Sequence, residues 1–250
     1  MSPAPAAAGA DVQELPKGAV KHELVHSMFD AIAPRYDLLN TLMTFGLDRL
    51  WRRRTVGFLG LAPDGVVADV GAGTGELCVE LTRFGLRGLG VDLSLEMLLA
   101  GGIRSSRSLQ GDAAQLPIDT GALDGIVSGF ALRNFADLPA TLSEMARVLR
   151  PAGRLALLEV DTPRSKVLQA GHRIWFTRVV PRLGALLSDA AAYRYLPRSV
   201  AYLPTQAELE TALVEAGFTD VVHHQLSGGL TQVVTATRSG DYGIMRDRRR

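Results

Sequence analysis

The chain has 250 residues, of which 47% are hydrophobic, and it carries a formal net charge of +1 at pH 7. That length and hydrophobic share are sufficient for one substantial α/β domain and do not require a second one. A net charge this close to zero gives no reason to expect a nucleic acid or an acidic macromolecule as a partner. Residues 1–10 lack the pattern of a signal peptide, and no apolar run reaches the roughly 18 residues of a membrane helix. We therefore expect a cytoplasmic protein.

The N-terminal region is expected to contain a leader followed by helices. Residues 1–20 are rich in Ala and Pro, which predicts a flexible leader. Within residues 21–60, apolar side chains recur at helical spacing: Phe29, Ile32, Tyr36 and Leu39. We expect these helices to form a cap over a ligand site. The basic run Arg52 to Arg54 is expected to be a solvated helix face.

A glycine-rich loop follows the first predicted strand. Residues 65–70 form a short apolar run, typical of a parallel sheet, and lead into Asp-Val-Gly-Ala-Gly-Thr-Gly at residues 69–75. The three glycines let the chain turn sharply and let a ligand approach the backbone closely. The helix predicted over residues 76–84 offers unpaired N–H groups at its start. Alone, such a loop is also consistent with a plain strand-to-helix turn.

Two further acidic residues stand where later strands end. Residues 89–92 are the next predicted strand, and Asp92 lies about 20 residues beyond the first glycine, where such units place a carboxylate for ribose hydroxyls. Ser94 is the better cap for the following helix, which leaves Asp92 free for a ligand. Asp112, followed by Ala113, is placed to accept a hydrogen bond from an adenine amine. The alternative for Asp112 is an ordinary turn aspartate.

The loop sequence distinguishes between two adenosine cofactors. A dinucleotide site has the pattern G-x-G-x-x-G, because a pyrophosphate lies on the helix N-terminus. Here the pattern is G-x-G-x-G, and Asp69 precedes it. A carboxylate repels a pyrophosphate but attracts a cofactor that carries an ammonium group. We therefore favour S-adenosylmethionine, which has an ammonium, a sulfonium and no phosphate.

The second half of the chain continues the alternation of strands and helices and then departs from it. Residues 151–153 predict a turn before a strand at residues 154–160. Residues 163–203 form a predicted helical insertion with a broad apolar face. This insertion is the candidate acceptor site, and simple packing on the sheet is the alternative. Thr205 and Glu208 predict a capping box at the next helix, and the last strands predict a closing antiparallel hairpin.

These features together resemble the class I S-adenosylmethionine-dependent methyltransferases, and more narrowly the ubiquinone/menaquinone biosynthesis C-methyltransferase family. The broader likeness rests on the loop at residues 69–75, on Asp92, on Asp112 with Ala113, and on the predicted strand at residues 125–128. The narrower likeness rests on four further stretches: residues 28–40, 46–53, 130–134 and 193–196. The resemblance runs from about residue 25 to about residue 229.

The resemblance implies an α/β fold with a doubly wound, mostly parallel seven-stranded sheet. It implies one methyltransferase domain over residues 21–238, with the cap at 21–60, the insertion at 163–203 and a basic tail at 239–250. The implied cofactor is S-adenosylmethionine, and we find no cluster of metal ligands and expect no metal. The cofactor-binding residues are then expected to be Asp69, Gly71, Gly73 and Thr74 at the methionine end, Asp92 at the ribose, Asp112 and Ala113 at the adenine, and Ser128 beside the sulfonium.

Methyl transfer to a ring carbon needs a base for a neighbouring hydroxyl and a group that stabilises the phenolate. Arg133 is the candidate for the stabilising cation, with a structural ion pair as the alternative. Tyr36 and Asp37 are candidate lid residues, and Tyr193 is a candidate orienting hydroxyl. For the tyrosines, a buried phenol is the alternative. Two aspartates remain open as the base: Asp48 and Asp189.

The expected reaction is C-methylation of a prenylated quinol ring, from demethylmenaquinol to menaquinol. The alternative is the same fold acting on another aromatic or secondary-metabolite acceptor, because the last strand, at residues 230–238, lacks the histidine typical of the family. The glycine loop disfavours a nucleotide-dependent oxidoreductase, and the presence of Asp92 disfavours a non-catalytic binding module. Such a substrate is compatible with peripheral contact at the inner face of a membrane. A homodimer remains open.

Overall fold

The computed structural model describes residues 16–105, 107–161, 163, 165 and 199–240. Across these residues the strands form one seven-stranded sheet in the order β3-β2-β1-β4-β5-β7-β6. The strands are β1 Val66–Val70, β2 Arg87–Asp92, β3 Ser108–Gln110, β4 Leu123–Gly129, β5 Leu149–Val160, β6 Phe218–Leu226 and β7 Thr231–Arg238. Strands β1 to β5 pair in parallel, whereas β7 runs antiparallel to both neighbours. The predicted fold class is confirmed.

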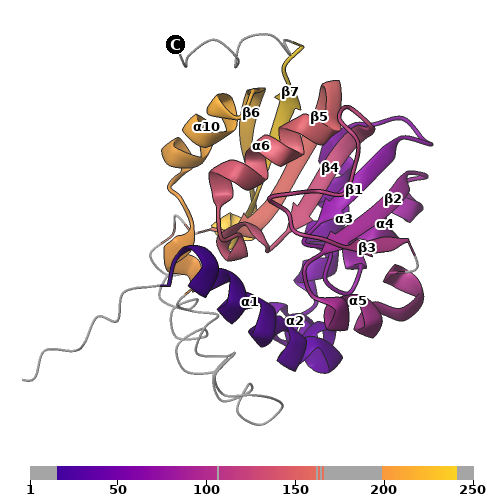
Figure 1. Cartoon of the computed structure of the whole chain (residues 1–250), viewed down its shortest axis with the longest axis vertical. Coiled ribbons are helices and arrows are strands. Elements are labelled where there is room, and N and C mark those ends of the chain that lie inside the picture. The colour runs from indigo at the N-terminus through magenta and orange to yellow at the C-terminus, as the bar shows by residue number, and fades with distance from the viewer. Residues whose placement is uncertain (1–15, 106, 162, 164, 166–198, 241–250) are drawn as a thin grey trace, which may run out of the picture.

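Helices cover both faces of the sheet. The α-helices are α1 Gly18–Ile32, α2 Tyr36–Thr44, α3 Leu47–Leu59, α4 Glu76–Arg83, α5 Leu95–Gly101, α6 Leu138–Val148 and α10 Gln206–Glu215. The 3-10 helices are η1 Ala33–Arg35, η2 Gly102–Ser105, η3 Leu132–Asn134, η5 Val200–Tyr202 and η6 Ser227–Gly229. Helices α3 and α4 pack on one face, and α6 and α10 pack on the other (Figure 1). No helix in the described ranges is long and apolar enough to cross a bilayer.

The central strand β1 shows why this sequence forms a sheet buried on both faces. Val67 belongs to the core shared with α3 and α4, whereas Ala68 and Val70 belong to the core shared with α6 and α10. All three side chains are fully buried. Because successive side chains of a strand point to opposite faces, Asp69 points toward the α3 and α4 side, where Val67 also lies.

The N-terminal region differs from its expected organisation in two respects. Helix α1 begins at Gly18, so the last residues of the predicted leader are helical. Helix α3 is not part of a cap, because Trp51, Val56 and Leu59 are buried in the sheet core beside α4. Helical spacing predicts a helix but does not say which surface that helix covers. The helices that lie below the sheet in Figure 1 are α1 and α2, and α1 packs against α5 and η3.

The turn predicted at residues 151–153 lies inside β5. Leu123 pairs with Leu149, and Gly125 pairs with Arg154, so the register shifts at this point. Four residues of β5 are therefore opposite Asp124 alone, and Ala152 has a φ of +62°, so the predicted turn forms a bulge within the strand. An ion pair between Arg150 Nε and Asp124 Oδ1, at 2.6 Å, closes the bulge.

The C-terminal predictions are confirmed where the structure describes them. Thr205 Oγ1 accepts a hydrogen bond from the Glu208 N–H, and the Glu208 carboxylate accepts one from the Thr205 N–H, which completes the capping box. Strands β6 and β7 form the antiparallel hairpin. Most of the insertion predicted at residues 163–203, including Tyr193 and Asp189, and the tail from residue 241 lie outside the described residues.

We expect Thr205→Ala to lower the free energy of unfolding by about 1 kcal/mol, because it removes the capping acceptor of α10. Thr211→Ala is the matched control, since Thr211 is an exposed threonine whose hydroxyl only donates to the Ala207 carbonyl within the same helix. Urea denaturation measures both variants. An equal loss in the two would contradict a stabilising role for the capping box.

Candidate functional site

The sheet order reverses between β1 and β4, and a cavity of about 580 Å³ lies at the carboxyl ends of these strands. Its walls come from the loops after β1, β2, β3 and β4, and from α1 and Tyr36. Doubly wound sheets bind their ligands in the crevice at such a switch point. The volume is within the range of about 300–1,000 Å³ that is typical of small-molecule sites.

Two glycines of the loop after β1 line this cavity, and neither position has space for a side chain. A Cβ at Gly71, whose φ is +74°, would lie 2.7 Å from the Ala131 Cβ. A Cβ at Gly73, whose φ is +55°, would lie 3.0 Å from the Met97 Cε. Close packing against Ala131 and Met97 therefore accounts for glycine at both positions, and contact of Gly71 and Gly73 with the cofactor stays a prediction.

Asp92, at the end of β2, also lines the cavity, but it has structural bonds that the sequence did not indicate. Its Oδ2 accepts a hydrogen bond from the Gly73 N–H at 2.7 Å, and its Oδ1 accepts one from the Ser94 N–H at 2.8 Å. Burial raises the pKa of this carboxyl, and the two N–H groups oppose that rise. Ser94 caps α5 as predicted. The Asp92 carboxylate therefore already accepts two hydrogen bonds, and each oxygen keeps a second lone pair for a ribose hydroxyl.

Helix α1 contributes cavity residues that sequence reasoning missed. His22 and His26 line the cavity, and His22 Nε2 lies 3.4 Å from Asp112 Oδ2. Asp112 and Ala113 line the same end, where an adenine is expected. The i, i+4 spacing of the two histidines, followed by Phe29 three residues later, was the signal that one face of this helix meets a ligand.

Asp69 lies behind the glycine loop and is buried, with 1% of its surface exposed. Its Oδ1 has no hydrogen-bond partner, and the Cys78 Sγ lies 3.9 Å from its Oδ2. Burial raises the pKa of this carboxyl to about 7, the charge of Asp92 adds to the rise, and Arg52 opposes it. An unpaired buried carboxylate is stabilised by a cation. The ammonium group of S-adenosylmethionine fits this requirement.

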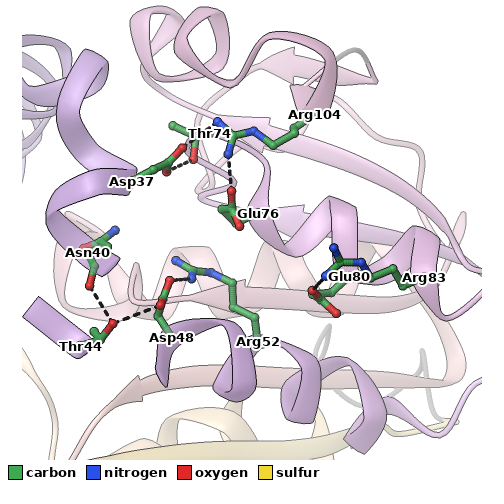
Figure 2. Close-up of polar contacts among 10 residues, drawn as sticks. All are labelled: Asp37, Asn40, Thr44, Asp48, Arg52, Thr74, Glu76, Glu80, Arg83 and Arg104. Carbon is green, nitrogen blue, oxygen red and sulfur yellow. Dashed lines mark hydrogen bonds and ion pairs between the residues drawn. The ribbon is translucent and has the colours of Figure 1, made fainter. Parts of the chain in front are cut away.

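Thr74 and Ser128 form hydrogen bonds within the protein and lie outside the described lining of the cavity. The Thr74 hydroxyl donates to Asp37 at 2.6 Å, and the Ser128 hydroxyl donates to the Val70 carbonyl at 2.6 Å. Asp37 also accepts a hydrogen bond from Arg104 at 2.7 Å. Figure 2 shows Arg104 between Asp37 of α2 and Glu76 of α4, so this arginine links α2 to the glycine loop.

Tyr36 lines the cavity and packs edge-to-face against Phe29, with ring centroids 5.9 Å apart. Burial raises the pKa of its hydroxyl, whereas Asn40, Arg52 and Arg133 lower it. The hydroxyl is therefore near two arginines. Tyr36 and Asp37 lie where a lid would be, although their role as a lid remains a prediction.

Arg133 makes a structural ion pair, which was the alternative to its predicted role as the phenolate-stabilising cation. Its guanidinium pairs with Glu159 at the end of β5 and donates to the Ser199 hydroxyl at 3.1 Å. Arg133 and Glu159 are both buried, with 9% and 2% of their surfaces exposed. Among the described residues, the neighbouring Asn134 lines the cavity and Arg133 does not.

Asp48 and Arg52 also differ from their predicted roles. Arg52 is 6% exposed and pairs with Asp48, so the expected solvated basic face begins only at Arg53. The other oxygen of Asp48 accepts a hydrogen bond from Thr44 at 3.1 Å. Both oxygens of Asp48 are thus occupied, which argues against this residue as the base.

We expect Arg133→Met to lower the free energy of unfolding by about 3–5 kcal/mol, because it leaves the buried Glu159 without its cation. The double variant Arg133→Met/Glu159→Gln removes both charges and is expected to recover most of this loss. Chemical denaturation compares the two. A single variant as stable as the parent would show that the pair does not hold η3 to β5.

Asp69 is expected to make the stability of the ligand-free protein depend on pH. Its pKa is about 7 in the folded chain and about 3.9 in an unfolded one. The folded state therefore binds this proton more tightly, so the contribution to stability is complete below about pH 4 and is lost as the pH rises toward 7.

The contribution of Asp69 to the free energy of unfolding falls by at most about 1.4 kcal/mol for each pH unit. Asp69→Asn has no proton to lose and is expected to lack this part of the decline. Urea denaturation of both proteins between about pH 5 and pH 7 measures the difference. Parallel pH profiles would contradict the assignment.

Comparisons with known proteins show the family of this chain. The chain matches the model of the ubiE/COQ5 methyltransferase family over residues 17–238. It is 42% identical over 219 residues to the demethylmenaquinone methyltransferase of Mycolicibacterium vanbaalenii, covering 87% of this chain and 96% of the relative. It is 39% identical over 220 residues to the ubiquinone/menaquinone biosynthesis C-methyltransferase UbiE of Syntrophotalea carbinolica, covering 85% and 93%.

Solved structures agree at the level of the fold. A SAM-dependent methyltransferase from Thermotoga maritima has a TM-score of 0.61 at 21% identity, covering 86% of this chain and 100% of that one. The phosphoethanolamine N-methyltransferase 2 of Haemonchus contortus, in complex with S-adenosyl-L-methionine, has a TM-score of 0.56 at 15% identity, covering 75% and 52%. The chain therefore belongs to the ubiE/COQ5 methyltransferase family and is an S-adenosylmethionine-dependent C-methyltransferase.

Proposed function

We propose that this enzyme methylates a ring carbon of a prenylated naphthoquinol and converts demethylmenaquinol to menaquinol. Relatives named demethylmenaquinone methyltransferase support this substrate. The one from Roseiflexus castenholzii is 41% identical over 233 residues and is matched over 98% of its length. The single observation that carries the proposal is the agreement of these relatives with a cavity that is lined by both carboxylates and aromatic side chains.

The polar residues of the cavity lining suit the cofactor. Asp92 is assigned to the ribose, Asp112 and Ala113 to the adenine, and the backbone of Gly71 and Gly73 to the methionine chain. These roles follow from the positions of the residues in the cavity wall and from the chemistry of each group.

The apolar residues of the lining suit a fused ring and the start of a prenyl chain. They include Val25 and Phe29 of α1 and Phe130 and Phe135, which follow β4. A prenyl chain has no polar group, so burial among apolar side chains is its main source of binding free energy. Because a prenylated quinol partitions into lipid, we also propose that the enzyme meets it at a membrane surface.

The bound cofactor supplies an activated methyl group on a sulfonium. The protein has to align that methyl with the ring carbon and exclude water. The transfer forms one carbon–carbon bond, breaks the sulfur–methyl bond with its electron pair left on sulfur, and releases the ring proton. In this arrangement α1 and Tyr36 cover the cavity, and Arg133 with Glu159 positions the loop of Phe130 to Asn134.

The first test is incubation of the purified full chain with S-adenosylmethionine and chemically reduced demethylmenaquinone in detergent. We expect mass spectrometry to detect one added methyl group on the ring. Asp92→Ala is expected to abolish the product, because it removes the ribose acceptor and frees the glycine loop. Asp220→Ala, which changes an exposed aspartate of β6, serves as the control.

Demethylated benzoquinols, assayed in parallel, test the alternative suggested by the relative named UbiE. Methylation of the benzoquinol alone would overturn the naphthoquinol assignment and retain the reaction class. The absence of product from every quinol, with the cofactor still bound, would move the proposal to another aromatic acceptor.

A further inference from the structure

A second cavity, of about 290 Å³, lies beside the glycine loop between α2, α3 and the start of α4. Its carboxylates are already occupied. Asp37 accepts hydrogen bonds from Thr74 and Arg104, Asp48 pairs with Arg52, and Glu76 pairs with Arg104 (Figure 2). The acceptor groups around this cavity therefore have partners within the protein.

Two donor groups around the same cavity, Arg52 and Asn40, have N–H groups without acceptors among the described residues, whereas all three nitrogens of Arg104 donate to oxygens of the protein. Arg52 has five N–H donors, and in the described part of the chain only one of its nitrogens donates a hydrogen bond, to Asp48. By contrast, all three nitrogens of Arg147 donate to oxygens of α6 and of the segment before β4. The buried amide nitrogen of Asn40 has no hydrogen-bond partner either. The unmet requirement of this cavity is for a negatively charged oxygen.

The carboxylate of Asp69 has the opposite requirement, because one of its oxygens lacks a hydrogen-bond donor or a cation within the ranges that the structure describes. Its buried Oδ1 lacks a donor. Arg52 is close enough to lower the pKa of Asp69, yet its ion pair is with Asp48. A buried carboxylate that lacks a cation thus lies near a buried guanidinium with spare donors. One chemical group meets both requirements, because an α-amino acid carries an ammonium and a carboxylate on the same carbon.

Tyr36 connects this region to the cofactor cavity. Its side chain lines the larger cavity, while Asn40 and Arg52 both lower the pKa of its hydroxyl. The Arg52 guanidinium carbon also lies 5.9 Å from the ring centroid of Phe130, another residue of the larger cavity. A Cβ at Gly73 would lie 3.9 Å from the Tyr36 Cε1, so a ligand chain that passes Gly73 meets the Tyr36 ring, which these donors also affect.

We propose that Arg52, Asn40 and the Tyr36 hydroxyl bind the carboxylate of the methionine moiety of S-adenosylmethionine, while Asp69 binds its ammonium group. Asp48 is then a positioning residue that orients the Arg52 guanidinium. The proposal rests on the cofactor of the family and not on the quinol proposed above, so it stands or falls independently of the acceptor.

Comparing the affinities of two ligands distinguishes binding of the amino-acid group from a general loss of cofactor binding. S-adenosylhomocysteine carries the amino-acid group, whereas 5′-methylthioadenosine has the same adenosine and sulfur without it. The double variant Asp48→Asn/Arg52→Met removes both buried charges together, and Arg53→Met alters the exposed neighbour as the matched control. Titration calorimetry on the full chain measures all the affinities without an acceptor.

We expect the double variant to weaken binding of S-adenosylhomocysteine about 10- to 100-fold and to leave 5′-methylthioadenosine within about twofold of the parent. Arg53→Met is expected to change neither. An equal loss for both ligands, or no loss for S-adenosylhomocysteine, would overturn the proposal.

Asn40→Leu keeps the test decisive if the double variant fails to fold. The substitution leaves no buried charge unpaired, and it removes the side-chain contact by which Asn40 lowers the pKa of the Tyr36 hydroxyl. We expect a loss of up to about tenfold for S-adenosylhomocysteine alone. Unchanged affinity would show that Asn40 does not bind the carboxylate.

Discussion

The carboxylate of Asp92 joins two loops at the edge of the sheet where the cofactor cavity opens. One oxygen holds the glycine loop through the Gly73 N–H, and the other holds the start of α5 through the Ser94 N–H. The N–H groups of Gly71 and Ala72 both donate to the Val91 carbonyl, which extends the pairing of β1 with β2 past the strand end. These bonds offset the cost of burying a charge. They also fix the separation of the two loops, so the cavity depends on Asp92 before any ligand arrives.

Local features were predictable from the sequence because neighbouring residues decide them. The valine-rich β1, the glycine loop, the Ser94 cap and the Thr205 capping box each depend on residues close in the chain, and each is as predicted. The partner of a side chain that is distant in sequence was not predictable. Arg133 meets Glu159 because strand pairing places the segment after β4 beside β5. Asp48 and Arg52 are an i, i+4 pair of one helix, but the burial of this pair depends on how α3 packs on the sheet. The α1 histidines were missed for the same reason, since their helix meets the cavity only in the folded chain.

The elements over the site differ in how firmly they are held. Helix α3 is fixed by Trp51, Val56 and Leu59 in the sheet core. Helix α2 is joined to the glycine loop mainly through Asp37, which makes polar contacts with Thr74 and Arg104. The side chains of Asp37 and Arg104 are each about one-third exposed. Partly exposed ion pairs contribute about 1 kcal/mol or less. The polar contacts between α2 and the glycine loop are therefore weak, whereas the buried charges on α3 and β1 lie in the packed core.

The position of β7 has a consequence for changes in the length of the chain between β5 and β7. This strand pairs with β5 on one side and β6 on the other, so the sheet closes only after the chain has travelled from Val160 to Thr231. The free energy of closing such a connection rises slowly with its length, by about 0.6 kcal/mol for each doubling. A change in the length of this connection therefore has little effect on the free energy of closing the sheet.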